Sequence, residues 1–299
     1  MLDFVWDGLY WYIVDGLPEA ERNKFRVFFG RIFETYCQDL LVSVEGKIAG
    51  RVIPEFEYKK GTLTPDAFVR CGSDLVVIDF KAKRLKMQDT LIKGDSASLV
   101  EDMKQMFVTP AHKIYRHLKQ MAALTGEMTI DVNEARRIHA IVVTQGPFAS
   151  VKQMYREVDD YLRQEGLYDD FPIVHWHLLD IDEFEILIGM LDHGASLMSI
   201  LNQKSEPRYR YISFSDYVAY SKRRVQYASS IVSRGQALTS EVLTILTEAG
   251  SRNLRYRKMD FKIEALNKRR LCQSIWERFN QSHPTGRKVR YEKLQPCDH

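Results

Sequence analysis

The chain has 299 residues, of which 45% are hydrophobic and 28% are charged, a composition typical of a globular protein rather than a disordered one. Its four cysteines are scattered and form no CxxC pair, which argues against a disulfide scaffold or a structural zinc site and fits a reducing cytoplasm. The apolar runs are too short to span a membrane, and the N-terminus carries acidic residues where a signal peptide carries basic ones. We therefore expect a cytoplasmic protein without a membrane partner.

The formal net charge of +3 is unevenly distributed along the chain. Residues 251–299 hold 13 Lys and Arg against 5 Asp and Glu, so the first 250 residues carry a net charge of −5. A basic segment after an acidic body hints at a polyanionic partner, although a solvated basic helix is the simpler interpretation of charge alone. The basic residues considered for such contacts are Arg252, Arg255, Arg257, Lys258, Lys268, Arg269 and Arg270.

Hydrophobic periodicity predicts the order of the secondary structure elements. Helical spacing of apolar residues alternates with short β-branched runs that end at Gly or Pro. In chain order, the pattern predicts helices over 4–14 and 19–41, strands over 51–58, 66–70 and 75–83, a helix over 97–125 with a break at Thr109-Pro110, a strand over 137–144, a helix over 150–165, a strand over 173–178, and helices over 180–193 and 195–203.

This order of elements is typical of an α/β protein. A helix, a three-stranded meander, and then helices alternating with strands predict a mixed β-sheet core flanked by helices. We expect an N-terminal aromatic helix packed on the core (1–18), the α/β core itself (19–180) and a helical, basic C-terminal region (181–299).

The predicted hairpin between the second and third strands brings two carboxylates together. Gly72-Ser73 suits the central pair of a type II′ turn. Such a turn pairs Cys71 with Asp74, and the same register sets Asp66 directly opposite Asp79. Directly opposed residues have Cβ atoms about 4.5–5.5 Å apart. The hairpin therefore predicts a pair of neighbouring carboxylates.

Alternation along the third strand predicts which side chains accompany this pair. Residues two apart on a strand share a face, so Asp79 and Lys81 point to one side of the sheet. Ile78 and Phe80 point to the other side, into apolar packing. The lysine is thus expected beside the two carboxylates.

Two adjacent carboxylates repel each other unless a cation lies between them. Mg²⁺ (or Mn²⁺) prefers such oxygen ligands, so Asp66 and Asp79 are the candidate metal ligands. The backbone carbonyl of Phe80 and the carboxylate of Glu34, from the preceding helix, are further candidates. A metal there would activate water and neutralise phosphate charge, and Lys81 would orient the water and stabilise the transition state.

These residues resemble the motif of the PD-(D/E)XK nuclease superfamily, whose members share the restriction-endonuclease-like fold. The matching residues are Pro65-Asp66, Asp79-Phe80-Lys81 and the helix-borne Glu34. The resemblance covers roughly residues 19–180 and implies Mg²⁺-dependent hydrolysis of nucleic-acid phosphodiester bonds. It implies catalytic roles for the two aspartates, the lysine and Glu34.

Further residues are candidates for substrate binding. Many members of the superfamily carry a Gln, Lys or Tyr on the helix after the D-x-K strand, and the candidates here are Lys113, Tyr115 and Gln120. No single one aligns cleanly, because Thr109-Pro110 interrupts that helix. Lys83 lies just beyond the D-x-K strand, where a phosphate contact and a solvated strand end are equally consistent with the sequence.

A second polar feature is His175-Trp176-His177, which sets two imidazoles on one face of a predicted strand. This spacing can bind zinc, but no further ligand cluster accompanies it. We therefore interpret these residues as ordinary, partly exposed histidines.

Taken together, these features predict a metal-dependent nuclease that acts on nucleic acid, on DNA rather than RNA. An endonuclease of restriction or anti-phage defence type is the specific expectation. The alternative is a catalytically silent nuclease-like module for nucleic-acid binding or assembly. A homodimer, or a partner protein bound through the C-terminal helices, is compatible with either function.

Overall fold

The computed structural model describes residues 17–85, 93–124, 129–146, 152–223, 226–237 and 240. The predicted helix over 4–14 and the basic segment over 251–299 lie outside the described residues. The chain forms two compact units, Met1–Ala237 and Leu238–His299. All of the elements described below belong to the first unit.

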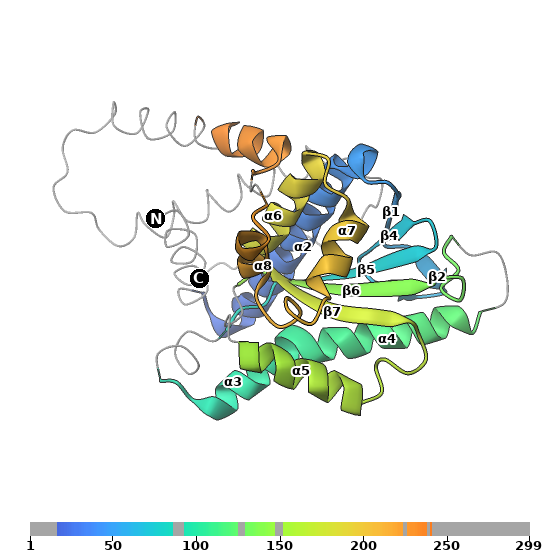
Figure 1. Ribbon diagram of the computed structural model, residues 1–299. Coiled ribbons are helices and arrows are strands. Elements are labelled where there is room, and N and C mark those ends of the chain that lie inside the picture. The colour runs from blue at the N-terminus through green and yellow to red at the C-terminus, as the bar shows by residue number, and fades with distance from the viewer. Residues whose placement is uncertain are drawn as a thin grey trace. The chain divides into compact units, whose positions relative to one another are not determined.

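A five-stranded sheet lies at the centre of this unit (Figure 1). Its strands β1, β4 and β5 form an antiparallel meander, whereas β5, β6 and β7 run parallel. Parallel neighbours need crossover connections, and the helices between these strands supply them. The predicted α/β fold with a mixed sheet is confirmed. In spatial order the strands are β1 (Arg51–Pro54), β4 (Ala67–Cys71), β5 (Asp74–Lys81), β6 (Arg137–Thr144) and β7 (Ile173–Asp180).

Helices cover both faces of the sheet (Figure 1). A short 3₁₀ turn, η1 (Glu45–Lys47), follows the first described helix. One face carries α2 (Glu19–Ser43), α6 (Ile181–Asp192), α7 (Leu197–Lys204) and α8 (Phe214–Tyr220). The opposite face carries α3 (Ser96–Met103), α4 (Thr109–Ala122) and α5 (Lys152–Gln164).

The central strand β5 divides its side chains between the two apolar layers. Val76, Ile78 and Phe80 pack in the layer that contains α2 and α6, and Leu75 and Val77 pack in the layer that contains α4. This alternation follows from the two-residue period of a strand. By the same alternation, the polar residues Asp79 and Lys81 at the end of β5 face α4.

The chain leaves the sheet between β1 and β4, where the sequence pattern predicts one continuous strand over 51–58. Strand β1 ends at Pro54, which has no N–H group to continue a ladder. The amide of Glu55 donates instead to the carbonyl of Asp66 (3.1 Å), which closes the excursion directly before β4. The excursion itself is a small separate hairpin of β2 (Glu57–Lys59) and β3 (Thr62–Leu63).

The helix predicted over 97–125 is interrupted close to the expected position. A π-helical turn, η3 (Lys104–Val108), joins α3 to α4. Pro110 lacks the N–H group that the carbonyl of Met106 would accept in an α-helix, and a π turn accommodates such a local mismatch without ending the helical path. Helix α4, which carries Lys113, packs on β5 and β6.

The helices after residue 180 share the core with α2. Phe184 of α6, Ile200 of α7 and Tyr217 of α8 are all buried in the same apolar layer as Leu40 of α2. These helices belong to the first compact unit, Met1–Ala237.

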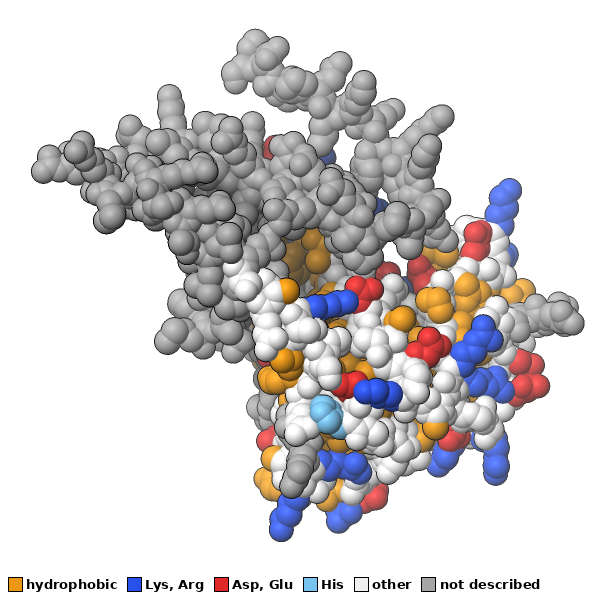
Figure 2. Space-filling view, turned by 90° about the horizontal axis from the view of Figure 1, so that it is seen from above, with side chains coloured by type: hydrophobic (Ala, Val, Ile, Leu, Met, Phe, Trp, Pro, Cys, Tyr) orange, Lys and Arg blue, Asp and Glu red, His pale blue; other side chains and the backbone are white. Residues whose placement is uncertain are grey.

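The surface of the described residues carries both signs of charge. On the face seen in Figure 2, Lys and Arg side chains are interspersed with Asp and Glu. Across the described ranges, no helix is both long and apolar enough to cross a membrane.

The close packing of α6 on the chain around Gln226 predicts a sensitive position. A Cβ atom added at Gly189 would lie 1.9 Å from the carbonyl oxygen of Gln226, and backbone cannot move aside as a flexible side chain can. We expect Gly189→Ala to destabilise the protein by about 1–3 kcal/mol, measured by thermal unfolding. Gly46→Ala is the control, because an added Cβ there meets nothing within 4 Å, and equal melting temperatures for the two variants would contradict this packing.

Candidate functional site

The hairpin register brings the two predicted carboxylates together. Cys71 pairs with Asp74, and Gly72 has φ +62°, as the first central residue of a type II′ turn requires. Strand β4 begins at Ala67. If the same register is continued to the residue before it, Asp66 lies opposite Asp79. The predicted hairpin register is confirmed from Cys71–Asp74 to Ala67–Ile78, and the Oδ2 atom of Asp66 accepts a hydrogen bond from the amide of Phe80 (2.6 Å), which places this carboxylate beside the end of β5.

The predicted division of side chains at the end of β5 is also confirmed. Phe80 lies in the α2 and α6 layer, where its ring packs edge-on against Phe184 with centroids 5.7 Å apart. Asp79 and Lys81 lie on the opposite face, which α4 covers. Lys113 of α4 reaches them there.

Two lysines contact the two carboxylates, and we call these four residues the carboxylate–lysine cluster: Asp66, Asp79, Lys81 and Lys113. The Lys113 ammonium lies 3.0 Å from Asp79 Oδ1 and 3.8 Å from Asp66 Oδ1. The Lys81 ammonium lies 2.5 Å from Asp79 Oδ2 and donates to the carbonyl oxygen of Phe80 (3.3 Å). The residue before β4, the end of β5 and helix α4 thus converge on one point.

The carboxylates of the cluster are almost completely removed from solvent. The side chain of Asp79 is 0% exposed and that of Asp66 is 6% exposed, whereas those of Lys81 and Lys113 are 30% and 33% exposed. Asp79 Oδ2 is buried without a hydrogen bond, because Lys81 approaches it closely but not along a hydrogen-bonding direction. The ion pair with Lys81 therefore offsets the charge on this oxygen in place of a hydrogen bond.

Burial and mutual repulsion set the acid–base chemistry of the cluster. Burial, together with the charge of Asp79, raises the pKa of Asp66 to about 7, although the two lysines and the Phe80 amide oppose the shift. Burial by itself would lower the pKa of Lys113, but the charges of Asp79 and Asp66 outweigh it, and the pKa is raised. Lys113 is therefore held in its charged form.

Glu34 stands at the edge of the cluster, on α2. Burial raises the pKa of its carboxyl group, and its charge interacts with Glu55, Lys81, Lys113 and Asp79. Its Oε1 atom accepts a hydrogen bond of 3.5 Å from Gln38, one helical turn later. The helix thus presents a third carboxyl group towards the cluster.

Sequence reasoning missed two residues that support the cluster. Gln38 donates both to Glu34 and to the backbone carbonyl of Asp66 (3.3 Å), and so ties α2 to the start of β4. Glu55 acts on Glu34 and Lys113 by its charge. The i, i+4 spacing of Glu34 and Gln38 is a sequence signal that could have identified Gln38. The position of Glu55 gives no such signal, because it depends on the β2–β3 excursion.

The other substrate-binding candidates lie away from the cluster. Lys83 donates to Gln105 (2.5 Å) on an exposed surface. Tyr115 donates to Asp170 (2.5 Å) and packs on Phe171. Gln120 accepts from a tyrosine of β2 on the flank of α4. Of the three candidates on the helix, only Lys113 is brought to the carboxylates.

The cluster has the oxygen donors that a hard divalent cation takes. The carboxylates of Asp66 and Asp79 and the carbonyl of Phe80 are ligands of the kind Mg²⁺ prefers, and the two carboxylates already lie against cationic groups, the ammonium groups of Lys81 and Lys113. The residues therefore fit a cation bound by few protein ligands. Over the described ranges, no group of three or more His, Cys, Asp or Glu side chains is arranged to hold a metal ion.

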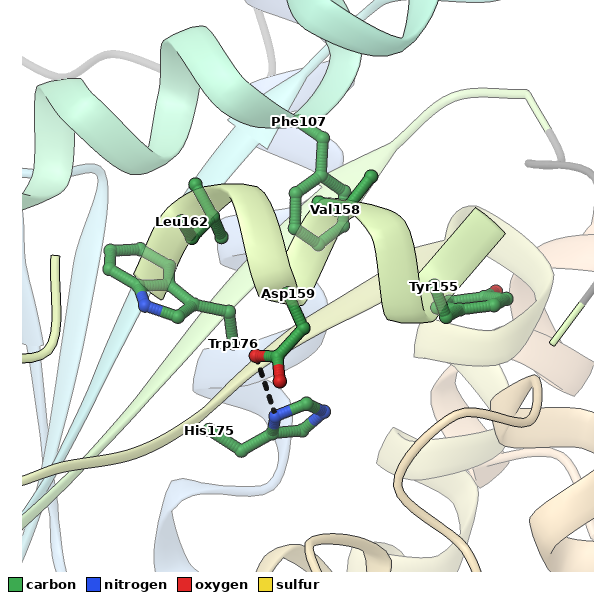
Figure 3. Close-up of a pocket in the computed structure, with 7 residues that line it drawn as sticks. All are labelled: Phe107, Tyr155, Val158, Asp159, Leu162, His175 and Trp176. Atoms are coloured by element: carbon green, nitrogen blue, oxygen red, sulfur yellow. Dashed lines mark ion pairs between the residues drawn. The ribbon is translucent and has the colours of Figure 1, made fainter. Parts of the chain in front are cut away.

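The histidines of β7 are fully buried, so the expectation of partial exposure is wrong. His175 and His177 are 4% and 3% exposed, and His139 of β6 is 0% exposed. His177 Nε2 lies 3.1 Å from His139 Nδ1, and His175 lies 3.7 Å from Asp159 of α5, beside a small pocket (Figure 3). Helix α7 closes over this group, since its Asn202 contacts His139.

Burial keeps these three imidazoles neutral. It lowers the pKa of His175 to about 3 and that of His139 to about 4, and it holds the pKa of His177 well below its ordinary value. The neighbouring charges of Lys204 and Arg210 lower the pKa values of the two β7 histidines further. The three neutral imidazoles, together with Asp159 and Asn202, link β6, β7, α5 and α7.

No protein-family model matches the chain, and neither does any curated protein or solved structure. The geometry of the carboxylate–lysine cluster is consequently the main basis for a functional proposal.

Replacing Asp66 with Asn is expected to stabilise the protein above neutral pH. The folded state raises the pKa of Asp66 from 3.8 to about 7, so its contribution to stability is complete below about pH 4 and is lost as the pH rises through about 7. Asn keeps an oxygen for the Phe80 amide but carries no charge. We expect a higher melting temperature than the wild type in EDTA at about pH 8, and a smaller difference at about pH 5.

The matched control is Asp170→Asn, which removes an exposed carboxylate paired with Lys119 (2.7 Å). This variant gains no stability at alkaline pH. If the wild type instead has a higher melting temperature than Asp66→Asn in EDTA above neutral pH, the charge on the buried Asp66 does not destabilise the folded protein.

The buried histidines predict acid destabilisation. Because the folded pKa of His175 is about 3 against an ordinary 6.5, the unfolded state binds the proton first and stability falls as the pH drops below about 6.5. Replacing His175 with Phe keeps a ring of similar shape and removes the titration. We expect the slope of unfolding free energy against pH to decrease by up to about 1.4 kcal/mol per pH unit between about pH 6 and 4, measured by urea denaturation.

The control for this measurement is His112→Asn, since the His112 side chain is 42% exposed. This variant separates the loss of a buried imidazole from the loss of an exposed one. An unchanged slope in His175→Phe would mean that this histidine takes up its proton in the folded state.

Proposed function

We propose that this protein is a metal-dependent nuclease that hydrolyses nucleic-acid phosphodiester bonds. The single observation that carries the proposal is the pair of buried carboxylates, Asp66 and Asp79, set opposite each other at the end of a hairpin with Lys81 and Lys113 against them. Acidic pairs and lysines gathered at one point are the groups that phosphoryl chemistry uses.

The order of elements supports a finer assignment of the fold. A helix that carries Glu34, an antiparallel meander that carries the aspartates, then a helix and a parallel strand follow one another as in the restriction-endonuclease-like fold. We propose that the first unit has this fold and that the chain resembles the PD-(D/E)XK superfamily in its site as well.

Each residue has a role in this proposal. Asp66, Asp79 and the carbonyl of Phe80 hold Mg²⁺ or Mn²⁺, which neutralises phosphate charge and activates water when bound. Lys81, whose ammonium already lies against Asp79 and the Phe80 carbonyl, orients the attacking water and stabilises negative charge on the phosphate. Glu34 assists from α2, where its raised pKa suits it to hold or accept a proton.

The substrate of the proposed enzyme is DNA, and its role is restriction-like or anti-phage defence. Partly exposed lysines beside the buried carboxylates support a polyanionic substrate, because phosphate contacts release counterions and are favourable in any sequence.

A second candidate function is a catalytically silent nuclease-like module that binds nucleic acid or a partner. The observation that favours it is the charge balance of the cluster, in which two carboxylates contact two ammonium groups. In such an arrangement the two ammonium groups offset much of the carboxylate charge without a cation. The two functions differ in turnover and are separated by the experiment below.

Replacing Asp79 with Asn or Lys81 with Met tests the enzyme proposal. We expect either change to reduce divalent-dependent cleavage on the order of 10³-fold or more, because each removes a group that acts on the reacting phosphate. The measurement uses supercoiled, linear and single-stranded DNA and RNA with Mg²⁺, Mn²⁺ or EDTA.

Lys119→Met and Asp170→Asn are the matched controls, since these residues form an exposed ion pair on α4 and the loop before β7. They leave cleavage unchanged. Binding of nucleic acid without turnover by the wild type would favour the silent module, and equal cleavage by wild type and both cluster variants would exclude the proposed mechanism.

A further inference from the structure

The Lys113 ammonium occupies the space between the two carboxylates of the cluster. It contacts one oxygen of each, Asp79 Oδ1 at 3.0 Å and Asp66 Oδ1 at 3.8 Å. A group that lies against one oxygen from each of two opposed carboxylates stands where a shared cation would stand. Lys81 has a different place, against the other oxygen of Asp79.

The two lysines differ in how they are anchored. Lys81 is the last residue of β5, and its ammonium also donates to the carbonyl of Phe80 next to it. Lys113 comes from α4, on the layer that covers this face, and its side chain is 33% exposed. Lys113 can therefore withdraw from the carboxylates without any change in the sheet.

We propose that Lys113 is a built-in counterion that takes the cation position in the cation-free protein and that a divalent cation must displace it to bind. This inference rests on the proposed metal site of the nuclease. It explains how two carboxylates with little solvent exposure remain side by side: one positive charge substitutes for another. Competition by Lys113 sets the cation affinity of the site below that of the bare carboxylate pair.

The test is the affinity of the purified full-length protein for Mn²⁺, measured by electron paramagnetic resonance of the free ion at about pH 8, where protonation of Asp66 competes least. Lys113→Met removes the competing charge and keeps the apolar stem. We expect it to bind Mn²⁺ at least about tenfold more tightly than the wild type. Without a cation the same variant has a lower melting temperature, and Mn²⁺ raises that temperature more than it does in the wild type.

Three further variants make the result specific. Lys113→Gln is a second neutral replacement and is expected to behave as Lys113→Met does, with circular dichroism to establish that both are folded. Lys113→Arg keeps the positive charge and stays within about threefold of the wild-type affinity. Lys119→Met, from the same helix but paired with Asp170, does not change Mn²⁺ binding.

The outcomes separate this inference from the proposed function. If the wild type binds Mn²⁺ and both neutral variants bind it with equal or lower affinity, the proposed role of Lys113 is wrong, but the metal site itself is supported. Binding by neither wild type nor neutral variants up to about 10 mM Mn²⁺ overturns both, because the carboxylates then hold no cation even when the competitor is gone.

Discussion

The antiparallel pairing of β4 with β5 is the constraint on which the rest of this structure depends. The turn at Gly72 sets the register, and a shift of one residue would move every side chain of the hairpin to the other face of the sheet. Because the register holds, Ile78 and Phe80 complete the apolar layer under α2, while Asp66 and Asp79 meet under α4. Core and site are thus two faces of one hairpin.

Bringing these carboxylates together is unfavourable for folding, and several elements offset the repulsion. The amide of Phe80 binds one carboxylate, and Lys81 and Lys113 contact the pair from β5 and α4. The raised pKa of Asp66 shows that this compensation is incomplete. Strongly shifted pKa values such as that of Asp66 are common at functional sites. The buried histidines of β6 and β7 differ, because burial holds them in the neutral form.

Much of the fold could be predicted because its periodicities are local. The helical spacing of α2, the β-branched run of β5 and the Gly72-Ser73 turn each report on neighbouring residues, and all three predictions are confirmed. The excursion through β2 and β3 was missed, since a three-residue strand has too short a pattern to read. Burial of His175 and His177 was also missed, because it depends on α7 and α5, which follow or precede β7 along the chain and cover it in space.

The sequence by itself determined that two carboxylates and a lysine lie on one face at the end of a strand, since strand alternation and a tight turn suffice for that. Only the tertiary structure decided which residue of the following helix joins them. Lys113, Tyr115 and Gln120 were equal candidates, and the packing of α4 against the sheet brought Lys113 to the carboxylates while the other two bind residues elsewhere. Which side of a helix faces the sheet depends on the packing of the whole apolar layer, here including the π turn before Pro110. A local sequence pattern does not contain this information.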